Sequence, residues 1–308
     1  LISPVDKGLL NLELNKDRFI RRTNFANNEI YIITSEDSPH VMKEIGRLRE
    51  HTFRQAGGGT GKEVDIDEFD IGSVPYKQLV VWDPKNKEIV GAYRFIRCAE
   101  APKNKKGEYQ LATAHLFKLT EKFVKDYMPY TIELGRSFVQ PLYQPITDPK
   151  RGLYSLDNIW DGLGAIIIDN PDIKYFFGKV TMYLNFDQRA RDMILYFLFK
   201  YFPDKKKIVV PYKPREILTD KKELKRIFSG KNYQEDYKIL VQCVRQYNEN
   251  IPPLVNAYMN LSPSMLTFGT ALNDTFGDVE ETGILVTISD IYDVKKERHL
   301  LSYKKGDI

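Results

Sequence analysis

The chain has 308 residues, of which 42% are hydrophobic and 29% charged, a composition typical of a globular protein with a substantial core. Its net charge of +4 is too small to predict nucleic-acid binding, and no nucleic-acid-binding motif accompanies it. No apolar run reaches the roughly 18 residues that a membrane-spanning helix needs, so we expect a cytoplasmic protein.

The cysteines and histidines form neither a disulfide framework nor a metal-binding pattern. Cys98 and Cys243 lie far apart in the sequence without CxxC spacing, which favours free thiols in a reducing compartment. The four histidines form no HxH or HxxxH pair, so we expect no metal site.

The first part of the chain predicts a strand, a helix and a hairpin. Residues 28–34 (NEIYIIT) predict a strand, and the polar residues 35–39 are typical of a helix start. The helix ends at the glycine run 57–61, which lacks the GxxxxGK[ST] form of a phosphate loop. We interpret that run as a mobile connection. Residues 76–83 and 88–97 predict a β-hairpin.

Strands and helices alternate through the rest of the chain. The predicted elements are a strand at 131–139, helices at 155–168 and 187–201, strands at 175–185 and 283–289, and a helix at 252–259. This alternation predicts an α/β protein with a mixed sheet. The lysine-rich segment 203–254 predicts one or two amphipathic helices, at 221–229 and 233–247, that pack on the same core.

Two charged clusters lie at the edges of predicted strands. One is EVDIDEFD at 63–70, and the other is ELGRSFV at 133–139. Burying an ion costs several kcal/mol unless a partner compensates it, so a strand that keeps Glu133 and Arg136 among apolar residues needs a reason. We expect these charges to line a cleft.

A charged network is one explanation for the first cluster. Buried arginines favour bidentate carboxylate partners, so we expect Asp67 and Asp70 to join Arg49, Arg94 and Arg136. The alternative is that the first cluster forms a solvated acidic loop.

Four motifs occur in an order known from one superfamily. They are Arg49-x-x-x-Phe53, Asp67-x-x-Asp70, Gly91-x-x-Arg94 and Glu133-x-x-Arg136-Ser137. With them the sequence resembles the acyl-ACP-dependent N-acyltransferases of the GNAT-like superfamily. These include the enzymes that make ornithine and glycine lipids, often called haemolysin-like, and more distantly the acyl-homoserine lactone synthases. ELGRSFV looks most like the aminolipid branch.

The resemblance implies a single acyltransferase domain over residues 1–308. Its fold would be a GNAT-like three-layer α-β-α arrangement with a mixed, splayed central sheet and an added C-terminal helical elaboration. The core would span about 28–202 and 255–292, and 203–254 would be a basic helical insertion. The acetyl-CoA pyrophosphate loop of ordinary GNAT enzymes is absent after Val139, as expected when a carrier protein holds the donor.

The implied activity is transfer of a 3-hydroxy fatty acyl group from acyl carrier protein to the α-amine of glycine or ornithine, in aminolipid synthesis. No separate cofactor is expected, because the phosphopantetheine thioester of the carrier is the donor substrate. An acyl-homoserine lactone synthase and a non-catalytic acyl-carrier-binding relative are the alternatives.

Transfer to an amine needs a proton acceptor, alignment of the reactants and stabilisation of the oxyanion. The resemblance implies that Glu133 takes the amine proton, with Arg136 as the second catalytic residue. The alternative is a structural ion pair between the two, which their spacing in a regular strand allows only with a bulge. GNAT-like sheets carry such a bulge here. Among 19 tyrosines, none can be assigned to protonate the leaving thiol.

Five further residues are predicted to bind substrate. The charged network of Arg49, Asp67, Asp70 and Arg94 would order the amino-acid site, and Phe138 would line an apolar tunnel for the acyl chain.

Three groups of lysines, at 103–106, 205–207 and 221–226, are candidates to dock an acidic carrier protein, against the alternative of an ordinary solvated surface. The apolar stretch 193–202, followed by lysines, suggests a peripheral contact with the inner membrane, against the alternative of a packed helix.

Overall fold

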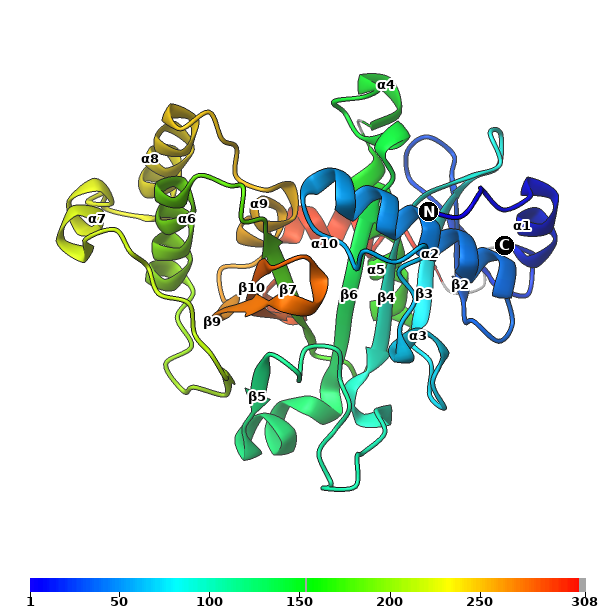
Figure 1. Cartoon of the computed structure of the whole chain (residues 1–308), viewed down its shortest axis with the longest axis horizontal. Helices are drawn as coiled ribbons and strands as arrows, with labels where there is room; N and C mark the ends of the chain where they lie inside the picture. The colour runs from blue at the N-terminus through cyan, green and yellow to red at the C-terminus, as the bar shows by residue number, and fades with distance from the viewer. Residues whose placement is uncertain (153, 305–308) are drawn as a thin grey trace. The chain divides into compact units, whose positions relative to one another are not determined.

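The computed structural model describes residues 1–152 and 154–304, which divide into two compact units (Figure 1). The first unit holds residues 1–112, 128–174 and 292–304, and the second holds 113–127 and 175–291. Each unit is therefore assembled from segments that lie far apart in the sequence. The assignment of residues 1–308 to a single domain stays a prediction.

Five strands of the first unit form a sheet in which every neighbouring pair is antiparallel. In spatial order they are β1 (Phe19–Arg22), β2 (Glu29–Ile33), β3 (Lys77–Asp83), β4 (Glu88–Arg97) and β6 (Thr131–Val139). The predicted hairpin is confirmed as β3 and β4. Both strands are buried along almost their whole length, which requires cover on both faces of the sheet.

Two helices supply that cover. Gln78 and Leu79 are successive residues of β3 and therefore point to opposite faces. Gln78 bonds to Arg49 of α2 (Pro39–Ala56), whereas Leu79 contacts Gly162 of α5 (Ser155–Asp169). The α-β-α layering expected for a GNAT-like fold is thus confirmed in this unit. The remaining helices of the unit are α1 (Lys7–Glu13), α3 (Glu68–Ile71), α4 (Pro149–Gly152) and α10 (Asp293–His299).

The glycine run after α2 wraps around a carboxylate of the same chain. The buried Glu50 accepts hydrogen bonds from the backbone N–H groups of Thr60 and Gly61, at 2.9 and 2.8 Å, and from the Thr60 hydroxyl at 2.7 Å. Burial raises the pKa of Glu50, but these donors and Arg54 lower it below its usual value. A buried anion therefore binds this run at Thr60 and Gly61, and its interpretation as a mobile connection stays a prediction.

The second unit contains two small antiparallel sheets. One has the order β7 (Tyr175–Met182), β10 (Val279–Thr287), β9 (Leu266–Asn273), and the other pairs β5 (Phe117–Leu119) with β8 (Val209–Pro211). The predicted strands at 175–185 and 283–289 are confirmed as β7 and β10. This unit also contains a single π-helical turn, Phe123–Tyr127.

Four α-helices complete the second unit, namely α6 (Gln188–Tyr201), α7 (Lys221–Ile227), α8 (Tyr233–Gln246) and α9 (Pro253–Met259). The amphipathic helices predicted within 203–254 are confirmed as α7 and α8. Phe197 of α6 packs against Phe228 and against Tyr233 and Tyr237 of α8. An aromatic cluster therefore fastens the basic segment to α6.

The apolar stretch 193–202 belongs to this packed cluster. Met193, Leu195 and Leu198 are at most 3% exposed, so the packed-helix alternative accounts for them. Among the described residues, no helix combines the length and the apolar character needed to cross a bilayer.

Gly91 offers a test of the packing between β4 and β6. A Cβ atom added there would lie 2.4 Å from the backbone oxygen of Phe138. We expect Gly91→Ala to lower the free energy of unfolding by about 1–3 kcal/mol, because the added methyl group overpacks the contact between the strands. Urea denaturation measures this loss. Gly135→Ala is the control, since its Cβ would meet nothing closer than 3.5 Å. Equal losses in the two variants would contradict this account.

Candidate active site

β6 carries a β-bulge at Arg136. Its register with β4 pairs Ala92 with Phe138 but Arg94 with Gly135, so β6 uses one residue more than β4 over this interval. Arg136 has φ 49°, a left-handed conformation that is unusual for a residue with a side chain. The bulge expected from the resemblance is therefore present, and it breaks the alternation of side chains along β6.

We expect the first charged cluster at a strand edge, but the structure places it elsewhere. It is a loop that leads into α3, whose N-cap is Asp67. The Asp67 carboxylate accepts from the N–H of Phe69 at 3.0 Å, and the Asp70 carboxylate accepts from the N–H of Asp67 at 3.2 Å. This capping box fixes both carboxylates close together.

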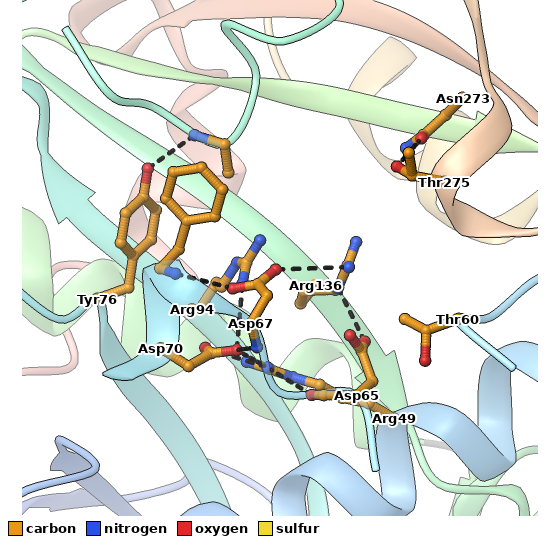
Figure 2. A network of polar contacts seen from close by, with 12 residues as sticks. Arg49, Thr60, Asp65, Asp67, Asp70, Tyr76, Arg94, Arg136, Asn273 and Thr275 are labelled. Carbon is orange, nitrogen blue, oxygen red and sulfur yellow. Dashed lines mark hydrogen bonds and ion pairs between the residues drawn. The ribbon is translucent and has the colours of Figure 1, made fainter. Parts of the chain in front are cut away.

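Asp70 joins two arginines that come from different elements (Figure 2). Nη1 of Arg49, on α2, donates to the two carboxylate oxygens of Asp70 at 3.1 and 3.0 Å. Nη1 of Arg94, on β4, donates to Oδ2 of Asp70 at 3.2 Å and to Oδ1 of Asp67 at 2.7 Å. Arg49 and Asp70 are fully buried, and Arg94 is 3% exposed. The cluster therefore ties α2, α3 and β4 together.

Arg136 completes the network through a carboxylate that the motifs did not single out. Its Nε lies 2.8 Å from Oδ2 of Asp65, and its Nη2 lies 3.6 Å from Oδ2 of Asp67. Asp65 is fully buried, and its N–H donates to the carbonyl of Gly46 in α2. Because Asp65 and Asp70 are both fully buried, the alternative of a solvated acidic loop is wrong.

The network contains three arginines and three aspartates, so its formal charges cancel. Gln78 adds neutral contacts, accepting from Arg49 at 2.6 Å and donating to Asp70 at 3.0 Å. Burial raises the pKa of Asp70, but Arg49 and Arg94 hold it well below its usual range. Burial lowers the pKa of Arg94, but Asp70 and Asp67 outweigh it and raise that pKa. Asp70 and Arg94 therefore stay ionised at neutral pH.

Glu133 lies on the same strand as Arg136 and is fully buried. Its Oε2 accepts a very short hydrogen bond from the hydroxyl of Tyr76 and a second one, of 3.1 Å, from the N–H of Ala112. Burial, and then the charge of Glu133, raise the pKa of Tyr76 well above its usual value. The guanidinium of Arg94 lies 5.4 Å from the centre of the Tyr76 ring, which links this pair to the network.

The structure thus gathers six of the seven predicted site residues in one region of the first unit. Phe138 lies on β6 beyond the bulge and is 4% exposed, opposite Ala92. The roles of all seven toward a substrate stay predictions. Asp65, Gln78 and Tyr76 were missed: Asp65 lies in the first charged cluster but outside the four motifs, and no motif or spacing marks Gln78 or Tyr76. No group of three or more His, Cys, Asp or Glu among the described residues is placed to hold a metal ion.

The ionisation of Asp70 should make the free energy of unfolding depend on pH in the acidic range. Its pKa is depressed in the folded state, so its contribution is present above the ordinary aspartate pKa of about 3.9 and is lost as the pH falls below it. We expect Asp70→Asn to cost about 3–5 kcal/mol at pH 7, because it leaves buried arginines uncompensated, and to flatten the pH dependence below pH 4. Urea denaturation between pH 2.5 and 7 measures both.

The exposed ion pair of Asp126 and Lys122, 2.8 Å long, supplies the control. Asp126→Asn should leave the unfolding free energy near that of the wild type, because solvent screens exposed pairs. Similar losses in both variants would contradict a special role for the buried network.

Comparison with known proteins places this network in a family. Residues 48–148, which contain all the network residues, match the acetyltransferase (GNAT) domain. A glycine N(alpha)-acyltransferase of Phocaeicola vulgatus is 55% identical over 305 residues, covering 99% of this chain and 94% of the relative. A glycine N(alpha)-acyltransferase of Bacteroides thetaiotaomicron is 52% identical over 303 residues, covering 98% and 90%.

Two solved structures show a weaker likeness. FeeM, an N-acyl amino acid synthase from uncultured soil microbes, gives a TM-score of 0.38 at 9% identity, over 89% of this chain and 96% of that one. The acyl-homoserine lactone synthase LasI gives 0.32 at 16% identity, over 49% and 71%. At these scores neither likeness carries an argument. The family is shown instead by the sequence identity to the two glycine N(alpha)-acyltransferases over almost the whole chain. The protein belongs to their family and is an N-acyltransferase with a GNAT-like fold.

Proposed function

We propose that the protein transfers a 3-hydroxy fatty acyl group from acyl carrier protein to the α-amine of glycine, as a step in aminolipid synthesis. The observation that carries this proposal is the identity of 55% and 52% to two glycine N(alpha)-acyltransferases over nearly the whole chain. It favours glycine over ornithine as the acceptor. It also favours this activity over lactone synthesis and over a non-catalytic carrier-binding role.

The chain around Gly152 supports a carrier-bound donor over coenzyme A. GNAT enzymes that use acetyl-CoA hold its pyrophosphate with a glycine-containing loop in front of a helix, and Gly152 is the only glycine at the comparable place. A Cβ atom on Gly152 would lie 2.2 Å from the backbone N of Pro145 and 2.5 Å from the carbonyl carbon of Gln144. The space beside this glycine is thus filled by the protein's own backbone, so it offers no cradle for a diphosphate.

Glu133 is the proposed proton acceptor. A free amino acid carries its amine largely as an ammonium ion at neutral pH, so one proton must leave before the amine attacks the thioester. Because Glu133 has no exposed surface, the proton has to arrive through a hydrogen-bonded neighbour. The proposed neighbour is the Tyr76 hydroxyl, which donates to Glu133. Because Tyr76 is itself only 1% exposed, the amine proton would reach its oxygen through a water molecule while Tyr76 gives its own proton to Glu133.

The raised pKa of Tyr76 suits this relay, because the phenol stays protonated until Glu133 takes its proton. Deprotonation produces the neutral amine, which attacks the carbonyl carbon. The C–N bond forms, the C–S bond breaks, and the second proton lost by the amine nitrogen goes to the departing sulfur, so the carrier leaves with a free thiol. The bulge in β6 leaves a residue outside the regular ladder, and its backbone N–H is the proposed donor to the oxyanion.

Arg136 is the proposed partner of the substrate carboxylate. Its side chain is 14% exposed, against 0% for Arg49 and 3% for Arg94. Arg49 and Arg94 are held by Asp70 and so act as positioning residues, which keep α3 and its aspartates in place beneath Arg136. The acyl chain is proposed to lie along Phe138.

An assay with purified protein tests the proposed reaction. With 3-hydroxyacyl carrier protein as the donor, we expect N-acylglycine to form, with kcat/KM for glycine at least about tenfold above that for ornithine, measured by mass spectrometry. No product with any amino acid, from folded protein, would remove the proposal. Preferred acylation of S-adenosylmethionine would instead establish a lactone synthase.

The proton relay predicts the effect of two conservative changes. Glu133→Gln should lower kcat by about 10²–10⁴-fold, the usual worth of a general base, with folding and carrier affinity retained. Tyr76→Phe should lower kcat by at least about tenfold, because it interrupts the relay. Both are measured by steady-state kinetics.

Tyr143→Phe is the matched control for the relay, since Tyr143 is also buried and donates to a carboxylate, that of Asp83, at 2.8 Å. It should keep wild-type kcat. A Tyr76→Phe enzyme as active as Tyr143→Phe would rule out the relay.

A further inference from the structure

The segment 203–254 carries more positive charge than the entire chain. It contains twelve Lys or Arg and seven Asp or Glu, a net charge of +5, whereas all 308 residues together carry +4. The rest of the chain therefore has a net charge of −1. The basic character of this protein is thus concentrated in one part of the second unit.

The acidic residues of this segment are engaged within the unit itself. Asp220 accepts from the backbone N–H groups of Lys222 and Glu223 and so caps α7, and Asp236 pairs with Lys200 at 2.5 Å. Four others also have partners in the unit: Asp204, Glu223, Glu235 and Glu249. Only Glu216 is left among the seven. The acids are therefore poorly placed to neutralise the exposed lysines.

Helix α7 is the part of this segment in which the cations are least compensated by acids. Its exposed residues are all cationic: Lys221, Lys222, Lys225 and Arg226. Leu224, between them, is fully buried, so the four cations share the outward side of the helix. Within the described residues, none of these four forms an ion pair. α7 thus presents an uncompensated positive face.

A pocket of about 560 Å³ adjoins this face and shares Lys221 with it. Its apolar side chains are Tyr196, Phe199 and Ile217, its cationic ones are Lys200, Arg215 and Lys221, and one acid, Glu216, lines it as well. Arg215 pairs with Glu280 through Nε, and Lys200 pairs with Asp236. The surface therefore combines a row of free cations with an apolar recess.

We propose that α7 and this pocket form the docking surface for the acyl carrier protein. The proposal rests on the function proposed above, in which the carrier brings the acyl donor. An acidic helix of the carrier would lie against the cations of α7, and an apolar side chain of that helix would enter the recess beside Lys221. Complementary charge of this kind raises the rate of association and selects the partner.

The shape of this surface favours a protein over an anionic membrane. A helix that binds at a membrane interface places large apolar side chains among its cations, where they enter the lipid. The exposed side of α7 has none, because Leu224 is fully buried and Ile227 is half-buried; Leu218, which is 67% exposed, precedes the helix. The apolar groups of this surface line a recess instead, which suits a protruding side chain.

Charge reversal at two pairs of lysines tests the proposal. K222E/K225E changes α7, and K16E/K43E is the control in the first unit, where both lysines are also exposed and belong to none of the candidate docking groups. Each variant lowers the net charge by the same amount. We expect K222E/K225E to raise KM for acyl carrier protein by at least about tenfold, to weaken its salt dependence and to leave kcat near wild type. The control should change KM by less than about twofold.

A short soluble thioester, acyl-pantetheine, separates docking from chemistry. Both variants should use it as the wild type does, and thermal unfolding should confirm that both are folded. Equal effects of the two variants on KM for the carrier would overturn the proposal. So would unchanged carrier kinetics in K222E/K225E together with lost sedimentation on phosphatidylglycerol vesicles, which would assign α7 to a membrane.

The wild-type enzyme alone tests whether acyl carrier protein is the donor. A wild-type enzyme that acylates glycine from acyl-pantetheine but never from acyl carrier protein would remove the carrier as donor, and the docking surface with it. A wild-type enzyme that uses the carrier, with a K222E/K225E variant that uses it equally well, would remove only the docking surface.

Discussion

The structure of the first unit depends on the mutual compensation of buried charges around Asp70. Each ion taken out of water costs several kcal/mol, and only partners in good geometry offset that cost. Arg49 comes from α2, Arg94 from β4, and Asp67 and Asp70 from α3. None of these elements can shift alone without leaving a buried charge uncompensated. The network therefore fixes the helix on one face of the sheet together with the loop that crosses it.

The same constraint accounts for the unusual backbone of β6. A regular strand would alternate its side chains, and residues 133 and 136 would then point to opposite faces. The bulge inserts an extra residue at Arg136, which adopts φ 49° at a cost of roughly 1–3 kcal/mol. Its ion pair with Asp65 offers a reason for the strain to persist. Strain held in place beside a cluster of charges is typical of a functional site.

Local patterns in the sequence predicted most of the long elements, because α2, α5, α6 and the β3–β4 hairpin have clear periodicity and clear ends. β9 was missed, since it buries Thr267, Thr270 and Asn273 and so lacks an apolar pattern. The network arginines and aspartates were predicted from motif order, but Asp65, Gln78 and Tyr76 were not. Gln78, Tyr76 and Asp65 contact Arg49, Glu133 and Arg136, which lie 29, 57 and 71 residues away along the chain, and no local rule specifies such pairs.

The network of the first unit and segment 203–254 of the second unit treat acidic side chains in different ways, and each way suits a different task. In the first unit, aspartates face arginines in a closed set of equal charge, shielded from water, where dissolved salt has little effect. In the second unit, the acids of residues 203–254 cap helices and turns or form local pairs, and the cations of α7 remain outside. Buried and balanced charges hold reacting groups in place, since they respond weakly to their surroundings. Exposed and unbalanced charges attract a partner over a distance of about a Debye length, near 8 Å at physiological salt, and release it as readily. A transferase that must hold its catalytic groups rigidly yet exchange its donor after every turnover needs both arrangements in one chain.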